Sequence, residues 1–125
     1  MNALNLAREA YSSAKTPIRT EKSTEYDAFA QITSRMKSAH ARGKPAFADL
    51  ANALHDNRRL WILLAADVAD PDNGLPQTLR AQIFFLAEFS LQHTDKVLAG
   101  SADIDALVDI NTTIMRGLRP QEVAV

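Results

Sequence analysis

Residues 47–69 read FADLANALHDNRRLWILLAADVA and carry the strongest periodic pattern in this sequence. Their apolar side chains recur in steps of three, four, seven, three and four residues, at Phe47, Leu50, Leu54, Trp61, Leu64 and Val68. This spacing places them on one face of a long amphipathic helix, and Asn57 interrupts the stripe. The pattern predicts a helix buried along one side, and it leaves open whether the helix is continuous through Asn57.

A second long helix is predicted beyond the turn-forming cluster Asp70-Pro71-Asp72-Asn73-Gly74. Pro76 can open this helix, which runs to about Ala99 before Gly100. One stripe of the helix consists of Leu79, Ile83, Leu86 and Val97, and its middle is broadened by Phe84, Phe85 and Phe89. A helix that is apolar nearly all round either lies centrally or offers a second apolar face to a partner. We expect the two long helices to pack antiparallel across the turn at 70–75.

Three further helices are predicted around this pair. Helical spacing of apolar residues indicates a short one from about Ala3 to Lys15, and another that ends at Gly43 in a left-handed cap. Ser101 is expected to cap a last helix that ends at Gly117. The sequence therefore predicts an all-α fold: a single-domain bundle of about five helices over residues 1–119, followed by a flexible tail over 120–125.

Composition limits the classes of protein that fit. The chain has 125 residues with 46% hydrophobic and 23% charged residues, as expected for one globular domain. Lys plus Arg number 14 and Asp plus Glu number 15, so no net field attracts nucleic acid or anionic lipid. The absence of cysteine excludes disulfides and thiolate metal sites. With neither a signal peptide nor a long apolar run, the chain is expected to be cytoplasmic and not inserted in a membrane.

The sequence shows no recognisable catalytic motif. His40, His55 and His93 have no second histidine or cysteine at ligand spacing. The four glycines form neither a nucleophile elbow nor a phosphate-binding loop. Paired acids such as Asp103 and Asp105 fall at helix ends, where capping explains them. We therefore expect no enzyme activity, no metal and no cofactor.

Basic residues keep a nucleic-acid alternative open. Arg58 and Arg59 lie beside Trp61, and further cations follow at Arg35, Lys37, Arg42 and Lys44. An RNA-binding surface interleaves basic groups with exposed aromatic platforms. Here the aromatic residues fall on apolar stripes, so a core with a solvated rim is the simpler interpretation.

Polar residues inside the stripes allow two interpretations. Asn57 and Asn111 stand where leucine is expected, and a buried asparagine is costly unless its amide is paired. The favoured interpretation is a hydrogen bond between helices that fixes their register. The alternative is an anchor for the backbone of a partner. Trp61 is either core filler or a residue at the edge of a groove, since its indole N–H needs an acceptor.

Several segments, taken together, resemble the FlaF flagellar family. They span nearly the whole chain: Pro17–Thr20 with Glu25-Tyr26, His55–Trp61 (HDNRRLW), Leu63–Val68, Asn73–Pro76, Leu79–Ile83, Leu86–Phe89 and Ile110–Leu118. No single segment is as specific as a metal motif, but their order and number make the resemblance strong.

The resemblance implies a function that periodicity does not show. FlaF-like proteins of alphaproteobacteria are needed for flagellin synthesis and export, and are thought to bind flagellin as a secretion chaperone. They act with FlbT, a regulator of flagellin mRNA translation. The resemblance thus implies a flagellin-binding chaperone and regulator of flagellum assembly. The alternatives are a regulator that contacts flagellin mRNA directly and an adaptor that acts only through FlbT.

A small helical protein can hold an amphipathic flagellin helix in an apolar groove between two of its own helices. Phe84, Phe85 and Phe89 are the predicted floor of that groove. Arg58, Arg59 and Arg80 are predicted to pair with acids on the captured helix. The full set of predicted partner-binding residues is Asn57, Arg58, Arg59, Trp61, Asn73, Leu75, Arg80, Phe84, Phe85, Phe89, Asn111 and Arg116.

Overall fold

The computed structural model describes residues 21–118. These residues form the α-helices α2 (Glu21–Arg42), α3 (Phe47–Ala69), α4 (Gln77–Leu98) and α5 (Asp105–Leu118), with a short 3₁₀-helix η1 (Lys44–Ala46) before α3. No strand occurs within the described range, so the all-α prediction is confirmed. α3 is continuous through Asn57. The predicted helix over 3–15 and the predicted tail over 120–125 lie outside the described residues.

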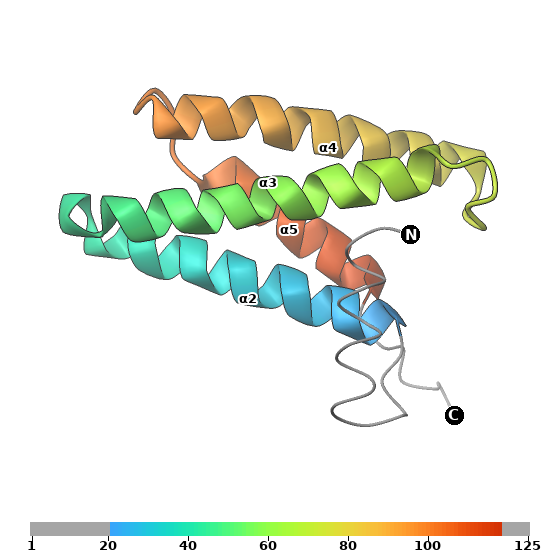
Figure 1. Cartoon of the computed structure of the whole chain (residues 1–125), viewed down its shortest axis with the longest axis horizontal. Coiled ribbons are helices and arrows are strands. Elements are labelled where there is room, and N and C mark those ends of the chain that lie inside the picture. Colours follow the sequence, from blue (N-terminus) through green and yellow to red (C-terminus); the bar gives the residue numbers. More distant parts are fainter. Residues whose placement is uncertain (1–20, 119–125) are drawn as a thin grey trace.

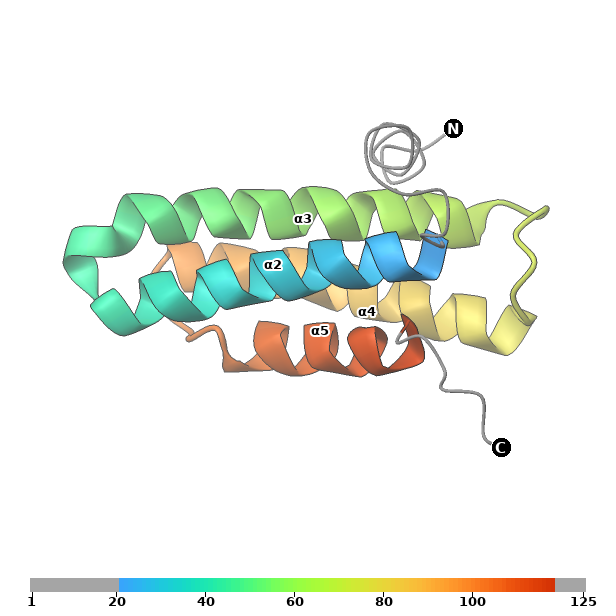
Figure 2. The ribbon, with the colours of Figure 1, turned by 90° about the horizontal axis from the view of Figure 1, so that it is seen from below.

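The four helices form an elongated bundle. Successive helices α2, α3 and α4 run antiparallel side by side (Figure 1), as predicted for the two long helices. The second view shows α3 and α5 on opposite sides with α2 and α4 between them (Figure 2). Each of α3 and α5 therefore contacts both α2 and α4. This arrangement gives the bundle one central core shared by all four helices.

Glycines of positive φ end two of the helices. Gly43, with a φ of 75°, follows α2 as predicted, and its N–H donates to the His40 carbonyl at 3.2 Å. Gly100, with a φ of 79°, follows α4. There Gly100 N–H donates to the Val97 carbonyl and Ser101 N–H to the Lys96 carbonyl, which is the Schellman pattern. Only glycine adopts such φ values at no steric cost.

The predicted start of the last helix was wrong, and its predicted end lies one residue before the last described residue of the helix. Ser101 does not cap α5, because its backbone and hydroxyl both donate to the Lys96 carbonyl and thus complete the end of α4. α5 begins four residues later at Asp105, whose N–H donates to Asp103 Oδ1 at 2.9 Å. Gly117 lies inside the last turn, because α5 reaches Leu118 and Gly117 has no positive φ.

The core consists of two apolar clusters. One contains Phe29, Leu60, Trp61, Leu64, Val68, Ile83 and Ala87. The other contains Met36, Ala53, Leu54, Val97, Ile104 and Leu107. Most predicted stripe positions are therefore buried, but two predictions were wrong: Phe47 is 52% exposed and Leu79 is 40% exposed. Both residues lie in the first turn of their helices, where the neighbouring helices give little cover.

Candidate partner-binding surface

A layer of polar side chains separates the two apolar clusters. Each helix contributes to this polar layer, which consists of Thr33 in α2, Asn57 in α3, Ser90 and Thr94 in α4, and Asn111 in α5. Every member is at most 5% exposed. In each helix the polar residue stands between a residue of one cluster and a residue that packs in the other; in α3, for example, Asn57 lies between Leu54 and Leu60.

Asn111 is the centre of the hydrogen bonds in this layer. Its Oδ1 accepts a bond from Trp61 Nε1 at 2.8 Å. Its Nδ2 donates to Asn57 Oδ1 at 2.8 Å and to Thr33 Oγ1 at 3.0 Å. One amide thus joins α5 to α3 and α2. A buried polar group without a partner costs about 1–3 kcal/mol, so these bonds favour the one register in which all of them form.

This geometry decides the two interpretations of Asn57, Trp61 and Asn111. All three are 0% exposed, and they bond to one another inside the core. The interpretation as interhelical hydrogen bonds is confirmed. Their prediction as partner-binding residues is untested, and their complete burial means that a partner could reach them only if the bundle opened.

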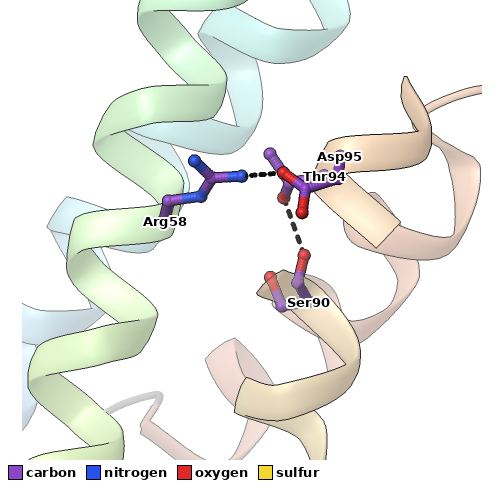
Figure 3. A network of polar contacts seen from close by, with 4 residues as sticks. All are labelled: Arg58, Ser90, Thr94 and Asp95. Atoms are coloured by element: carbon purple, nitrogen blue, oxygen red, sulfur yellow. Dashed lines mark hydrogen bonds and ion pairs between the residues drawn. The ribbon is translucent and has the colours of Figure 1, made fainter. Parts of the chain in front are cut away.

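The α4 part of the polar layer is less completely bonded. Thr94 Oγ1 donates to the Ser90 carbonyl at 2.7 Å, within the same helix. Asn57 Nδ2 and Ser90 Oγ are buried without a hydrogen-bond partner among the described residues. Arg58 of α3 forms an ion pair with Asp95 of α4 beside Thr94 (Figure 3). That contact places Asn57 and Thr94, the preceding residues, at the same height along the bundle.

Two of the predicted residues hold the turn between α3 and α4 together. Asn73 Nδ2 donates to the Asp67 carbonyl at 3.1 Å, and its Oδ1 accepts from Leu75 N–H at 3.0 Å. Arg80 Nη1 donates to the Asp70 carbonyl at 3.0 Å. Asn73 and Arg80 therefore shape the turn, while Leu75 is 39% exposed beside them.

The predicted cations differ in how they are engaged. Arg58 forms an ion pair with Asp95. Arg35 likewise pairs with Asp56 at 2.8 Å, and Arg42 with Asp49 at 3.1 Å. Arg59 and Arg116 are exposed. Of the three arginines expected to meet acids on a partner, Arg59 is therefore the one whose guanidinium is not engaged by a neighbouring helix or turn in the described contacts.

Three phenylalanines of α4 are exposed to solvent. Phe85 is 67% exposed, Phe84 is 40% and Phe89 is 38%. Beside Phe85 lies a shallow, mostly apolar hollow of about 470 Å³, here called the α4 hollow. Its lining consists of Thr78, Ala81, Gln82, Phe85 and Leu86. Exposed aromatic side chains beside an apolar hollow are typical of a surface that binds a protein partner.

The three phenylalanines do not share one floor, which corrects the prediction. Successive helical residues are rotated by about 100°, so Phe85 and Phe89 lie about 40° apart, but Phe84 and Phe89 lie about 140° apart. Phe84 falls on the flank of Asp95, which contacts α3. Phe89 stacks on His93, with ring centroids 5.4 Å apart, and His93 Nε2 lies 2.9 Å from the Asp103 carbonyl of the α4–α5 connection. Phe85 and Phe89 thus share one exposed face of α4, and Phe84, which is also exposed, lies on another.

Comparison with known families matches residues 7–118 to the family described as flagellar protein FlaF. The chain belongs to the FlaF family. It is therefore a flagellar protein, and the resemblance seen in the sequence is confirmed. The family match spans the whole bundle and all of the predicted partner-binding residues. No curated protein and no solved structure gave a significant match.

Two further findings concern membrane-spanning helices and metal-binding groups in the described residues. Within residues 21–118, no helix is long and apolar enough to cross a membrane. The same residues hold no group of three or more histidine or acidic side chains that could bind a metal ion.

Sequence reasoning missed Thr33, Thr78, Ala81 and Gln82. Thr33 stands four residues after Phe29 on the buried face of α2, and a threonine at that apolar spacing was the available signal. The residues that line the α4 hollow gave a weaker signal, because Thr78 and Gln82 are polar and have the character of ordinary surface residues. Their spacing to Phe85, of seven and three residues, was the feature that could have found them.

Proposed function

We propose that this FlaF-family protein binds an amphipathic terminal helix of flagellin and keeps it from associating before export. The observation that carries the proposal is the exposed apolar surface of α4, formed by Phe85, Phe89 and the α4 hollow. An amphipathic helix laid on this surface buries apolar area on both partners, and aromatic side chains at the centre supply most of the binding energy. The role in flagellin synthesis, with FlbT as a second partner, belongs to the same proposal.

Charge supports this reading over contact with RNA. The hollow is lined by no charged side chain, so docking there depends on apolar contact rather than on ion pairs. Arg35, Arg42 and Arg58 are engaged with acids of neighbouring helices. Phosphate binding requires cations that release counterions, and it weakens steeply as salt is added. Binding through α4 is expected to survive added salt.

The test is calorimetry of the full chain with monomeric flagellin and with flagellin lacking its terminal helices, at low and high salt. We expect binding that requires a terminal helix and that changes little with salt. Phe85→Gln should raise the dissociation constant at least about tenfold, which corresponds to roughly 1.4 kcal/mol. Phe47→Gln is the matched control, because it removes another exposed phenylalanine, 52% accessible, from the first turn of α3.

Two outcomes would count against the proposal. If neither form of flagellin binds, direct capture is wrong, and FlbT and flagellin mRNA become the partners to test. If both phenylalanine variants weaken binding equally, α4 is not the specific surface.

A further inference from the structure

The outward face of α4 carries a regular seam of six residues: Thr78, Gln82, Phe85, Phe89, Gln92 and Lys96. The steps between them are four, three, four, three and four, so the pattern repeats every seven residues, or 3.5 residues per step. That period is the one at which two helices stay in contact along their length. All six residues are exposed. The α4 seam therefore has the spacing of a helix-pairing surface and no helix of the described bundle against it.

The seam is also palindromic about Ala87. Phe85 and Phe89 lie two residues to either side of Ala87, and Gln82 and Gln92 lie five residues to either side. When two copies of such a helix are laid antiparallel, each Phe85 meets Phe89 of the other copy and each Gln82 meets Gln92. Aromatic rings pair favourably in offset or edge-to-face contacts, and two amides can exchange hydrogen bonds.

Charge does not oppose this pairing. Lys96 is the one charged residue of the seam, and it stands opposite Thr78 of the other copy. Among the other charged residues of α4, Arg80 is held by the Asp70 carbonyl and Asp95 by Arg58. Glu88 lies about 80° from the middle of the seam, at its solvent edge. No like charges therefore face each other along the line of contact.

We propose that a second copy of this chain packs antiparallel on the α4 seam and forms a two-fold symmetric dimer. A two-fold interface uses the same patch on both subunits, and a palindromic seam is self-complementary in that sense. One helix face per copy is a small interface, so the dimer is weak and depends on concentration. It covers Phe85 and Phe89 in the absence of another partner. The regulatory meaning rests on the proposed function: flagellin binds by displacing the second copy.

Disulfide cross-linking tests the register, because the chain contains no cysteine of its own. Cysteines form a disulfide only when their Cα atoms come within about 7 Å. We expect a mixture of Gln82→Cys and Gln92→Cys proteins to give a cross-linked mixed dimer under mild oxidation. Each variant alone should stay largely uncross-linked, because its own two copies of the cysteine are about ten residues apart, or about 15 Å along the helix axis. Gln31→Cys on the exposed face of α2 is the control for random collision.

Two cross-linking results would overturn the antiparallel dimer. Cross-linking of Gln82→Cys with itself would mean a parallel pairing. Cross-linking of the mixture no faster than that of Gln31→Cys would mean that the seam does not pair.

Sedimentation of the protein without flagellin measures the dimer directly. We expect the average mass to rise with concentration, and Phe85→Gln to raise the dimer dissociation constant at least about tenfold while Phe47→Gln does not. A monomer at all concentrations that still binds flagellin overturns the dimer and leaves the proposed function standing. A seam-dependent dimer that flagellin does not dissociate supports the second copy and removes its regulatory meaning.

Discussion

The polar layer and the outer face of α4 both depart from the rule that apolar side chains are buried and polar ones exposed, in opposite directions. In the polar layer, Asn57 and Asn111 are wholly buried and their bonds join three helices. On α4, Phe85 remains 67% exposed and contributes little to the core. The first departure specifies how the helices fit together. The second leaves binding energy for a partner, so the comparison separates residues that serve the fold from residues that serve an interaction.

The largest effect is expected when the centre of the polar layer is removed. Asn111→Ala breaks three hydrogen bonds and leaves Trp61, Thr33 and Asn57 with unpaired buried groups. We expect the free energy of unfolding to fall by about 3–5 kcal/mol, measured by urea denaturation. Asn52→Ala, on the exposed side of α3, should shift it by no more than about 0.5 kcal/mol. Equal shifts in the two variants would show that the layer does not stabilise the fold.

A smaller loss is expected when one donor is removed and the ring is kept. Trp61→Phe retains an aromatic side chain against Phe29, whose ring lies edge-on at 5.4 Å, but deletes the Nε1 donor to Asn111. We expect a loss of at least about 1–2 kcal/mol in the same denaturation experiment, from the deleted hydrogen bond and from the smaller ring in the core. A variant as stable as the parent protein would mean that this hydrogen bond has no net value.

The ion pair at the rim of the polar layer is expected to contribute little to the stability of the fold. Arg58→Gln removes the contact with Asp95, whose side chain is 74% exposed. Exposed pairs contribute about 0–1 kcal/mol, so we expect a loss of about 0.5 kcal/mol that disappears at high salt. Arg59→Gln, next in sequence and without such a contact in the described structure, is the control. A large loss that persists in salt would place Arg58 among the residues that specify the fold.

Substitution of Phe85 on the surface of α4 is expected to leave stability unchanged. This result would most clearly separate residues that serve binding from residues that serve the fold. Phe85→Gln should leave the free energy of unfolding within about 0.5 kcal/mol of the parent while it weakens flagellin binding. Thermal denaturation and calorimetry on the same sample measure both quantities. A clearly destabilised Phe85→Gln protein would mean that this face belongs to the core after all.

The fold was largely predictable because apolar periodicity is a local property. The stripe at Leu54, Trp61 and Leu64 and the turn at 70–75 both follow from residues close in sequence, and the structure confirms them. The start of α5 was mispredicted because Ser101 could serve either the helix before it or the helix after it, and its hydrogen bonds to the Lys96 carbonyl assign it to α4. Exposure at Phe47 depends on where neighbouring helices end, which local pattern does not encode.

The candidate site was less predictable because it depends on the packing of α4. The sequence shows that Phe84, Phe85 and Phe89 are apolar. It does not show which flank of α4 faces α3 and which faces the connection to α5. The contacts of Arg58 with Asp95 and of His93 with Asp103 settle that orientation. Once it is known, Phe84 separates from Phe85 and Phe89, and Asn57, Trp61 and Asn111 move from the predicted surface into the core.

The place of Asn111 in the last helix of the described bundle has a consequence for synthesis on the ribosome. α2, α3 and α4 follow one another through short connections, so their mutual contacts are local and can form early. Thr33, Asn57 and Trp61 are then already in place, but the amide that satisfies them is translated last. A nascent chain that stops before α5 holds three helices around unpaired polar groups. Synthesis of α5 is therefore the step that completes the hydrogen bonds of the polar layer.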